Sequence, residues 1–383
     1  MNITNDIKYI GVNDHEIDLF EGQYPVLNGM AYNSYLICDQ KTAVIDTVEA
    51  NFTSVWLENI ENELSNKAPD YLIVQHMEPD HSGSIKAFCE KYPQTTIVAN
   101  QKAFGMIKNF FGTDLGDRQI AVNENDTLNL GRHTLTFITA PMVHWPEVIM
   151  TYDNTDKVLF SADAFGKFGA FNANENWLDE ARRYYIGIVG KYGVQVNGVL
   201  KKAANLQIEK ICATHGPILS GDLTTYLHAY TKWANYQPEE NGVVIAYTSI
   251  YGNTKTAALN LAEKLAQKGV TVKVYDLARC DVFEAVANAF KYDKLVFATT
   301  TYNADIFPFM RSFIEHLTAR NFQNRKIAFI ENGSWAPMAT KVMKSLLEGC
   351  KNLTVCENNI TILSGINEQN KIDIQNLANE LSK

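Results

Sequence analysis

Short apolar runs alternate with amphipathic stretches through the second half of the chain. The apolar runs begin with G-V-V-I-A-Y at residues 242–247 and recur at 271–275, 294–298, 326–330 and 353–355. Helical patterns separate them, at residues 254–268, 310–319, 338–347 and 371–381. Apolar runs joined by crossover helices are typical of a doubly wound parallel sheet. Five such strands over about 140 residues predict a flavodoxin-like unit.

The first half of the chain has a less regular pattern. We expect strands at residues 34–38, 42–47, 71–74, 95–98, 134–139, 147–152 and 157–160, and helices at 52–64, 84–91, 101–110 and 223–234. Strand pairs that follow one another closely, with helices between the groups, predict two sheets with helices outside them. Residues 235–241, with one proline and two glutamates, form the expected linker. The predicted domains are therefore residues 1–237 and 242–383.

Composition restricts the classes of protein that the chain can belong to. It has 383 residues, 46% of them hydrophobic and 20% charged, which is typical of a folded globular protein. The net charge of −9 argues against a nucleic-acid binder. Six cysteines without a C-x-x-C pair predict a cytoplasmic protein with no zinc ribbon and no built-in rubredoxin. We see no secretory signal and no apolar run long enough for a membrane span.

The densest chemical signal is H-M-E-P-D-H, which follows the apolar run Y-L-I-V. Its metal-competent side chains are His76, Glu78, Asp80 and His81. A bare motif can arise by chance in a polar turn, so partners are needed. Three further donors stand just past predicted strands, where loops on a rigid scaffold build sites: His144, Asp163 and His215.

Seven donors are too many for one metal ion and suit two. Their spread along the chain is the pattern of the metallo-β-lactamase fold, whose ordinary form has H-x-H-x-D-H and binds zinc. Glu78 replaces the second of these histidines. An added hard, anionic oxygen donor favours iron or manganese over zinc. Asp163 is the candidate for the carboxylate that reaches both metals.

Three loops of the second half predict a flavin site. T-S-I-Y-G-N-T precedes a helix and can cradle a phosphate with backbone N–H groups. It contains no lysine and no G-x-G-x-x-G, which argues against a nucleoside triphosphatase and against NAD. T-T-Y-N-A and N-G-S-W-A follow later strands of the same sheet, with Tyr302 and Trp335 placed to sandwich a planar ring. The expected flavin mononucleotide (FMN) contacts are Thr248, Ser249, Ile250, Tyr251, Gly252, Asn253, Thr254, Thr300, Thr301, Tyr302, Asn303, Ala304, Asn332, Gly333, Ser334, Trp335 and Ala336.

Taken together, these motifs make the whole chain resemble the flavodiiron proteins. The resemblance implies a metallo-β-lactamase-like αββα sandwich followed by a flavodoxin-like parallel sheet. It implies that His76, Glu78 and His144 bind one iron, that Asp80, His81 and His215 bind the other, and that Asp163 bridges them. It also implies a tyrosine near the irons in R-R-Y-Y, either Tyr184 or Tyr185, which would supply a proton or a hydrogen bond; helix packing is the alternative for both.

The expected activity is reduction of O2 to water, of NO to N2O, or of both. Reduced FMN and two ferrous ions store four electrons, the number that one O2 requires. Family members form head-to-tail dimers, so we expect a homodimer or a dimer of dimers. The electron donor would be external, such as rubredoxin or a reduced deazaflavin. Two alternatives stay open: a zinc-dependent hydrolase with a flavodoxin-like regulatory domain, and an electron-transfer protein with a structural metal site.

Overall fold

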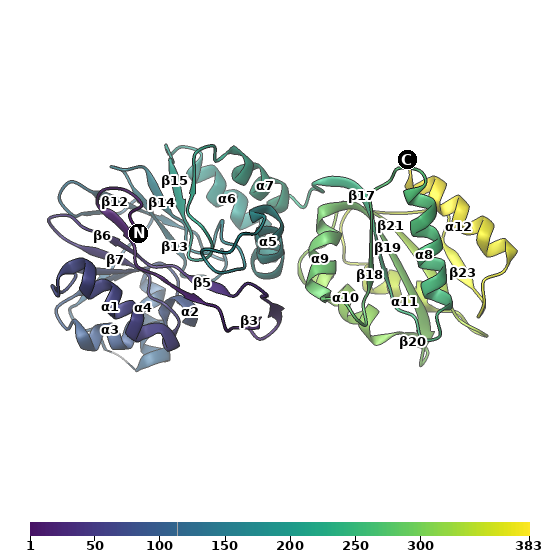
Figure 1. Cartoon of the computed structure of the whole chain (residues 1–383), viewed down its shortest axis with the longest axis horizontal. Coiled ribbons are helices and arrows are strands. Elements are labelled where there is room, and N and C mark those ends of the chain that lie inside the picture. Colours follow the sequence, from purple (N-terminus) through teal and green to yellow (C-terminus); the bar gives the residue numbers. More distant parts are fainter. Residues whose placement is uncertain (113) are drawn as a thin grey trace. The chain divides into compact units, whose positions relative to one another are not determined.

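The computed structural model describes residues 1–112 and 114–383, which divide into two compact units. The first unit covers Met1–Thr231 and the second Lys232–Lys383 (Figure 1). Each unit is described here by itself.

Two six-stranded sheets form the centre of the first unit. The first sheet runs β1 (Ile7–Tyr9), β6 (Tyr35–Ile37), β7 (Ala43–Ile45), β8 (Tyr71–Val74), β9 (Thr96–Ala99) and β10 (Gln119–Ala121). The second runs β11 (Thr127–Asn129), β12 (Thr134–Thr139), β13 (Ile149–Asp153), β14 (Val158–Phe160), β15 (Lys210–Cys212) and β16 (Leu219–Ser220). Their inner faces share one apolar core, in which the rings of Tyr35 and Phe160 lie 5.3 Å apart. Burying each such side chain stabilises the fold by about 1.5–3 kcal/mol.

Helices cover the outer faces of both sheets, which gives the predicted αββα sandwich (Figure 1). Outside the first sheet lie α1 (Thr53–Leu64), α3 (Ile85–Lys91) and α4 (Gln101–Phe111); outside the second lie α5 (Trp177–Tyr184), α6 (Gly193–Ala203) and α7 (Thr224–Ala234). A 3-10 turn (Ala50–Phe52) leads into α1, and the helices predicted at 52–64, 84–91 and 101–110 are confirmed. The strand expected at 42–47 ends earlier, at Ile45, because Asp46 takes a positive φ of 54°.

Several short strands near the amino terminus were not predicted. Strand β2 (Val12–Asp14) pairs with β5 (Met30–Tyr32), and β3 (Leu19–Phe20) pairs with β4 (Tyr24–Pro25). Strands of two or three residues are too short to show the alternation that marks a strand in a sequence. Their importance lies in their position, since Phe20 of β3 packs its ring 5.5 Å from that of His215.

The second unit contains a parallel sheet in the order β18-β17-β19-β21-β22, as predicted for a flavodoxin-like fold. Its main strands are β17 (Glu240–Tyr247), β18 (Val272–Asp276), β19 (Tyr292–Tyr302), β21 (Arg325–Asn332), β22 (Leu353–Val355) and β23 (Ile360–Ile362). The fifth strand is divided, because β22 and β23 pair with opposite ends of β21. Only β22 was predicted, and it coincides with the apolar run at residues 353–355.

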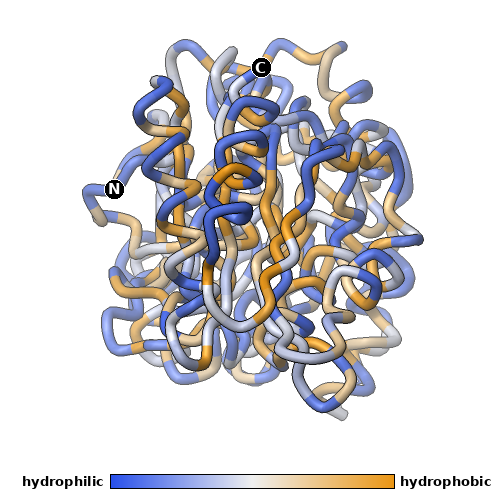
Figure 2. Tube along the Cα trace, turned by 90° about the vertical axis from the view of Figure 1, so that its right-hand side faces the viewer, coloured by the Kyte–Doolittle hydropathy of each residue, from blue (hydrophilic) through white to orange (hydrophobic). Residues whose placement is uncertain are grey.

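Helices α8 (Asn253–Ala266) and α12 (Glu368–Leu381) pack together over the sheet in one apolar cluster. The remaining helices are α9 (Val282–Lys291), α10 (Pro308–Ala319) and α11 (Ala339–Leu346). Hydrophobic stretches run along the inner strands, and hydrophilic residues occupy the outer turns (Figure 2). This distribution explains why apolar runs in the sequence marked the strands correctly.

One segment expected as a loop continues a strand. The residues T-T-T-Y extend β19 to Tyr302, which pairs with β20 (Asp305–Ile306) across a tight turn. Asn303 and Ala304 take positive φ angles of 50° and 55° at this turn. Two consecutive residues with positive φ are the geometry of a type I′ hairpin turn, which matches the twist of paired strands.

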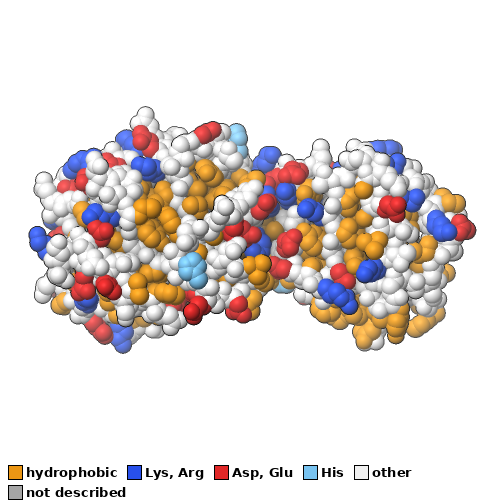
Figure 3. Space-filling view, viewed as in Figure 1, with side chains coloured by type: hydrophobic (Ala, Val, Ile, Leu, Met, Phe, Trp, Pro, Cys, Tyr) orange, Lys and Arg blue, Asp and Glu red, His pale blue; other side chains and the backbone are white. Residues whose placement is uncertain are grey.

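Acidic and basic side chains are interspersed over the face shown in Figure 3. None of the helices in residues 1–112 and 114–383 combines the length and the apolarity that a bilayer crossing requires.

Candidate functional site

The H-M-E-P-D-H segment lies directly after β8 and turns sharply into the short helix α2 (Pro79–Ser82). Proline at the first helical position starts the turn, and the N–H groups of His81 and Ser82 both donate to the carbonyl of Glu78 at 2.9 Å. The Thr47 hydroxyl donates to the carbonyl of His81 at 2.7 Å. The turn is therefore fixed from both sides, and His76 and His81 are fully buried.

The other three predicted donors come from strand ends of the second sheet. His144 lies in the loop between β12 and β13, Asp163 follows β14, and His215 follows β15. All three are at most 7% exposed. The structure thus brings all seven predicted metal donors to one end of the sandwich, in two groups: His76, Glu78, His144 and Asp163, and Asp80, His81 and His215.

In the first group, nitrogen and oxygen donor atoms lie close together. His76 Nε2 lies 3.3 Å from His144 Nε2 and 3.3 Å from Glu78 Oε2. His144 Nε2 lies 2.9 Å from the same Glu78 oxygen. In the second group, His81 Nε2 lies 3.1 Å from His215 Nε2, and both nitrogens are 3.2 Å from Asp80 Oδ2. Two imidazole nitrogens that face each other across carboxylates form the donor set of a cation site.

Asp163 connects the two groups through its two oxygens. Its Oδ2 lies 3.2 Å from His76 Nε2 and 3.0 Å from His144 Nε2, whereas its Oδ1 lies 3.1 Å from His81 Nε2. Thr214 also donates its hydroxyl to Oδ1 at 2.6 Å. This is the arrangement of a carboxylate that spans two metal positions.

Unpaired buried oxygens support the same interpretation. Within the described part of the chain, both carboxylate oxygens of Asp80 and Oδ2 of Asp163 are buried without a hydrogen-bond partner. Buried carboxylate oxygens of this kind are costly unless a cation is bound to them. The residues therefore fit a pair of metal ions.

The pKa values of groups among the metal donors show how strongly the carboxylates and histidines there interact. Although burial lowers it, the carboxylates of Asp163 and Glu78 raise the pKa of His144 to about 9. Asp163 behaves in the opposite sense: burial raises its pKa, but His76, His144 and His81 together hold it well below its usual range. Burial raises the pKa of the nearby Asp46 to about 6, even though His81, Gln75 and His76 lower it.

Sequence reasoning missed the groups that orient the histidines from behind. His76 Nδ1 lies 2.8 Å from Glu147 Oε1, and His215 Nδ1 lies 2.7 Å from the carbonyl of Ala31. A histidine ligand normally has such a partner on its second nitrogen, which fixes its tautomer. Glu147 could have been found from the sequence, because it is a carboxylate just before an apolar strand in H-W-P-E. The carbonyl of Ala31 could not, because every residue has a backbone carbonyl.

The two tyrosines of R-R-Y-Y have different surroundings. The ring of Tyr184, the last residue of α5, lies 5.4 Å from the ring of His215 and 5.2 Å from that of Phe168. Tyr185 opens a π-helical turn (Tyr185–Val189), and its ring lies 5.1 Å from that of Tyr230. A π-turn changes the direction of successive side chains, which explains why the two neighbours diverge.

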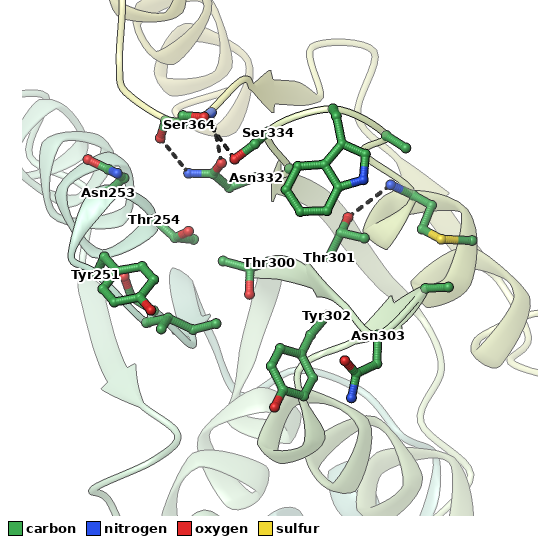
Figure 4. Close-up of a pocket in the computed structure, with 17 residues that line it drawn as sticks. Tyr251, Asn253, Thr254, Thr300, Thr301, Tyr302, Asn303, Asn332, Ser334 and Ser364 are labelled. Atoms are coloured by element: carbon green, nitrogen blue, oxygen red, sulfur yellow. Dashed lines mark hydrogen bonds between the residues drawn. The ribbon is translucent and has the colours of Figure 1, made fainter.

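The flavin loops line a cavity of 630 Å³ in the second unit. Tyr251 approaches it from the turn before α8, Thr254 from the first turn of α8, and Tyr302 from the end of β19 (Figure 4). The cavity is lined by Ser249, Ile250, Tyr251, Asn253, Thr254, Thr300, Thr301, Tyr302, Asn303, Ala304, Asn332, Gly333, Ser334, Trp335, Ala336, Met338 and Ser364. Met338 and Ser364 were not predicted, since their contacts depend on how distant loops meet.

Two predicted flavin residues do not line the cavity. Thr248 is fully buried, and its hydroxyl lies 2.6 Å from that of Thr299. Gly252 takes a φ of 95° at the residue before α8, a conformation that favours glycine. Both residues therefore shape the turn. Trp335 is 92% exposed and Tyr302 is 41% exposed, so both rings have free surface at the cavity rim.

The polar groups of the cavity fit the phosphate of FMN. The hydroxyl oxygens of Thr254 and Thr300 are buried without a partner in the described chain. Thr254 lies in the first turn of α8, where free backbone N–H groups attract an anion. Because no charged side chain lines the cavity, neutral donors would hold the phosphate there.

Comparisons with known proteins agree with both sites. A family model described as ODP family beta lactamase matches residues 30–216, and the flavodoxin model matches residues 245–362. The anaerobic nitric oxide reductase flavorubredoxin of Aliivibrio salmonicida is 30% identical over 349 residues, which are 88% of this chain and 69% of that protein.

Solved structures of the same architecture cover the whole chain. The rubredoxin oxygen:oxidoreductase from Desulfovibrio gigas aligns with a TM-score of 0.93 and 26% identity, over 100% of this chain and 97% of its own. The flavodiiron protein from Giardia intestinalis aligns with a TM-score of 0.93 and 25% identity, over 99% and 95%. The chain belongs to the flavodiiron protein family. It is an oxidoreductase whose cofactors are FMN and a non-haem pair of iron ions.

Proposed function

We propose that this protein reduces O2 to water, NO to N2O, or both gases, with electrons relayed through FMN. The observation that carries the proposal is the position of Asp163, whose two oxygens face two separate histidine groups. An iron pair with a neighbouring flavin supplies up to four electrons, and one O2 takes four electrons and four protons to give two waters. Two NO molecules take two electrons and two protons to give N2O and one water.

We propose the following ligands. His76, Glu78 and His144 bind one iron, Asp80, His81 and His215 bind the other, and Asp163 bridges them. The distances between donor atoms support this division, as does the nitrogen and oxygen character of the set. The alternative of a zinc-dependent hydrolase is not favoured, because the relatives found are oxidoreductases.

Protons for the products would come from residues of this chain. We propose Tyr184 for this role, because its ring lies 5.4 Å from that of His215. Burial and the charges of Asp163, Asp80 and Glu78 raise the pKa of Tyr184 well above its usual value. The aromatic side chains around it, Phe20 and Phe168, would limit the entry of bulk water.

The proposal also covers the domain bounds, the oligomeric state, the electron donor and the location of the protein. The domains run over residues 1–237 and 242–383, and a homodimer or a dimer of dimers brings one subunit's flavin to another subunit's irons. The donor is an external protein or cofactor, such as rubredoxin or a reduced deazaflavin. A cytoplasmic location agrees with the six cysteines, all of them free.

Metal analysis followed by gas consumption tests this function. We expect iron at about two ions per chain, with little zinc, and consumption of O2 or NO by photochemically reduced protein. Removal of iron by a chelator, with FMN retained, is the control and must abolish the rapid phase. A protein that holds zinc and consumes neither gas would overturn the proposal.

A further inference from the structure

We propose that Glu147 makes the two iron positions unequal, so that the iron at His76, Glu78 and His144 binds first and more tightly. The inference rests on the ligand assignment proposed above. It concerns a residue that touches neither iron and acts through His76 as a positioning residue.

Glu147 holds the back of the first position. Its Oε1 lies 2.8 Å from His76 Nδ1 and accepts the N–H of Met77 at 2.9 Å, and both the Glu147 and His76 side chains are fully buried. Because the Nδ1 proton is directed at a carboxylate, Nε2 keeps its lone pair for the metal. An anionic partner also makes the imidazole a stronger donor than a neutral partner does.

Among the described residues, no carboxylate is hydrogen-bonded to Nδ1 of either histidine of the second position. His215 Nδ1 is directed at the neutral carbonyl of Ala31. His81 Nδ1 is buried and has no hydrogen-bond partner among residues 1–112 and 114–383. The histidines of the second position are therefore oriented less firmly and polarised less strongly.

The count of negative charges gives the same order. Glu78, Glu147 and the shared Asp163 act on the first position, where Glu21 also interacts with Glu78 and His144, whereas Asp80 and the shared Asp163 act on the second. Asp46 interacts more strongly with His81 than with His76, but its carboxylate accepts hydrogen bonds from Gln75, whereas Glu147 lies at hydrogen-bond range of His76 itself. In a buried site of low dielectric constant, one additional carboxylate at hydrogen-bond range of a ligand favours a dication there.

A purely structural role for Glu147 is the competing explanation, since its bond to Met77 also fixes the loop. The variant Glu147→Gln separates the two roles. The amide oxygen can accept both N–H groups, so the geometry is kept while the charge is lost. Asp153→Asn is a matched control, because Asp153 Oδ2 lies 3.0 Å from His133 Nδ1 in an equally buried pair of the same unit, in a group separate from the seven proposed iron ligands.

Anaerobic titration of the full-length, FMN-loaded apoprotein with ferrous ions tests the proposal, with calorimetry as the readout. We expect two resolved binding steps in the wild type, of which His144→Ala abolishes the tighter and His215→Ala the weaker. Glu147→Gln should weaken the tighter step roughly tenfold or more and leave the other within about twofold. Asp153→Asn should leave both steps unchanged.

Three results would overturn the proposed role of Glu147. They are two iron-binding steps of equal affinity in the wild type, an unchanged tighter step in Glu147→Gln, or the same weakening of the tighter step in Asp153→Asn. Failure of the proposed function is a different result, in which the wild type binds no iron or binds iron but consumes no gas.

Discussion

The ring of Tyr184 lies 5.4 Å from the ring of His215, which is one of the seven candidate metal donors. We expect Tyr184→Phe to lower the rate of gas reduction by at least about tenfold, because a proton donor is lost. Iron and FMN contents should stay unchanged. Steady-state rates at saturating reductant, together with cofactor analysis, measure the effect.

Tyr185→Phe is the matched control for this change. Its ring contacts Tyr230, and its substitution should leave the rate within about twofold. Because the pKa of Tyr184 is raised well above its usual value, the wild-type rate should also show no loss up to about pH 10 from deprotonation of this residue. Equal losses in the two variants would contradict a special role for Tyr184.

The proposed flavin site includes a buried hydroxyl in the first turn of α8, that of Thr254. Thr254→Val removes the unpartnered hydroxyl while keeping the shape of the side chain. We expect the dissociation constant for FMN to rise roughly tenfold, the effect of losing one hydrogen bond to an anion. Fluorescence titration of the apoprotein measures it. Thr254→Ser keeps the hydroxyl and should bind FMN almost as the wild type does, whereas weak binding by both variants would point to packing instead.

Glu78 is the predicted reason for iron in place of zinc. Its Oε2 lies 2.9 Å from His144 Nε2, so a substituted side chain at residue 78 still faces the metal donors. Glu78→His restores the nitrogen-rich motif that suits zinc, and we expect the ratio of iron to zinc to fall on the order of tenfold. Elemental analysis after growth with both metals measures the ratio. An unchanged ratio would show that other features select the metal.

Acid should remove a specific stabilisation from the second unit. Although burial raises it, hydrogen bonds from the Asn358 side chain and from the N–H groups of Asn358 and Glu357 lower the pKa of Glu380 to about 2. A depressed pKa stabilises the fold above the unfolded value of about 4.3, and this stabilisation is lost as pH falls toward 2. Glu380→Gln should therefore lower the melting temperature at pH 7 and much less at pH 2.

The surface carboxylate Glu368 provides the comparison for this effect. Its side chain is 87% exposed and pairs with Lys371, so Glu368→Gln should change stability little at either pH. A pH-independent loss in Glu380→Gln would mean that its charge is not involved.

The sequence predicted the scaffold of the metal centre because each donor follows an apolar strand. His76 after β8, Asp163 after β14 and His215 after β15 all stand where loops leave a sheet. The supporting contacts were not predictable in this way. Glu147 reaches His76 from a loop 71 positions away, and Phe20 reaches His215 from a two-residue strand. Such contacts depend on how distant segments pack, which local periodicity does not contain.

In the flavodoxin-like unit, too, features set by local sequence were predicted and contacts between distant segments were not. Regular alternation of strand and helix predicted the doubly wound parallel sheet, and the phosphate turn before α8 was visible in its residue types. The division of the fifth strand was not predicted, because it depends on β22 and β23 pairing with opposite ends of β21. Thr248 was expected at the flavin, but pairing of its hydroxyl with that of Thr299 depends on the register of β17 against β19.

A single-turnover titration tests the central claim most directly. The fully reduced protein, with flavin hydroquinone and two ferrous ions, is prepared under anaerobic conditions. It is then mixed with increasing amounts of O2 or NO while the flavin and iron absorbances are followed. The account predicts that about one O2 per chain reoxidises both cofactors rapidly, without release of hydrogen peroxide, and that removal of iron abolishes this phase. Flavin reoxidation that is equally fast without iron and yields peroxide, with no reaction toward NO, would contradict it.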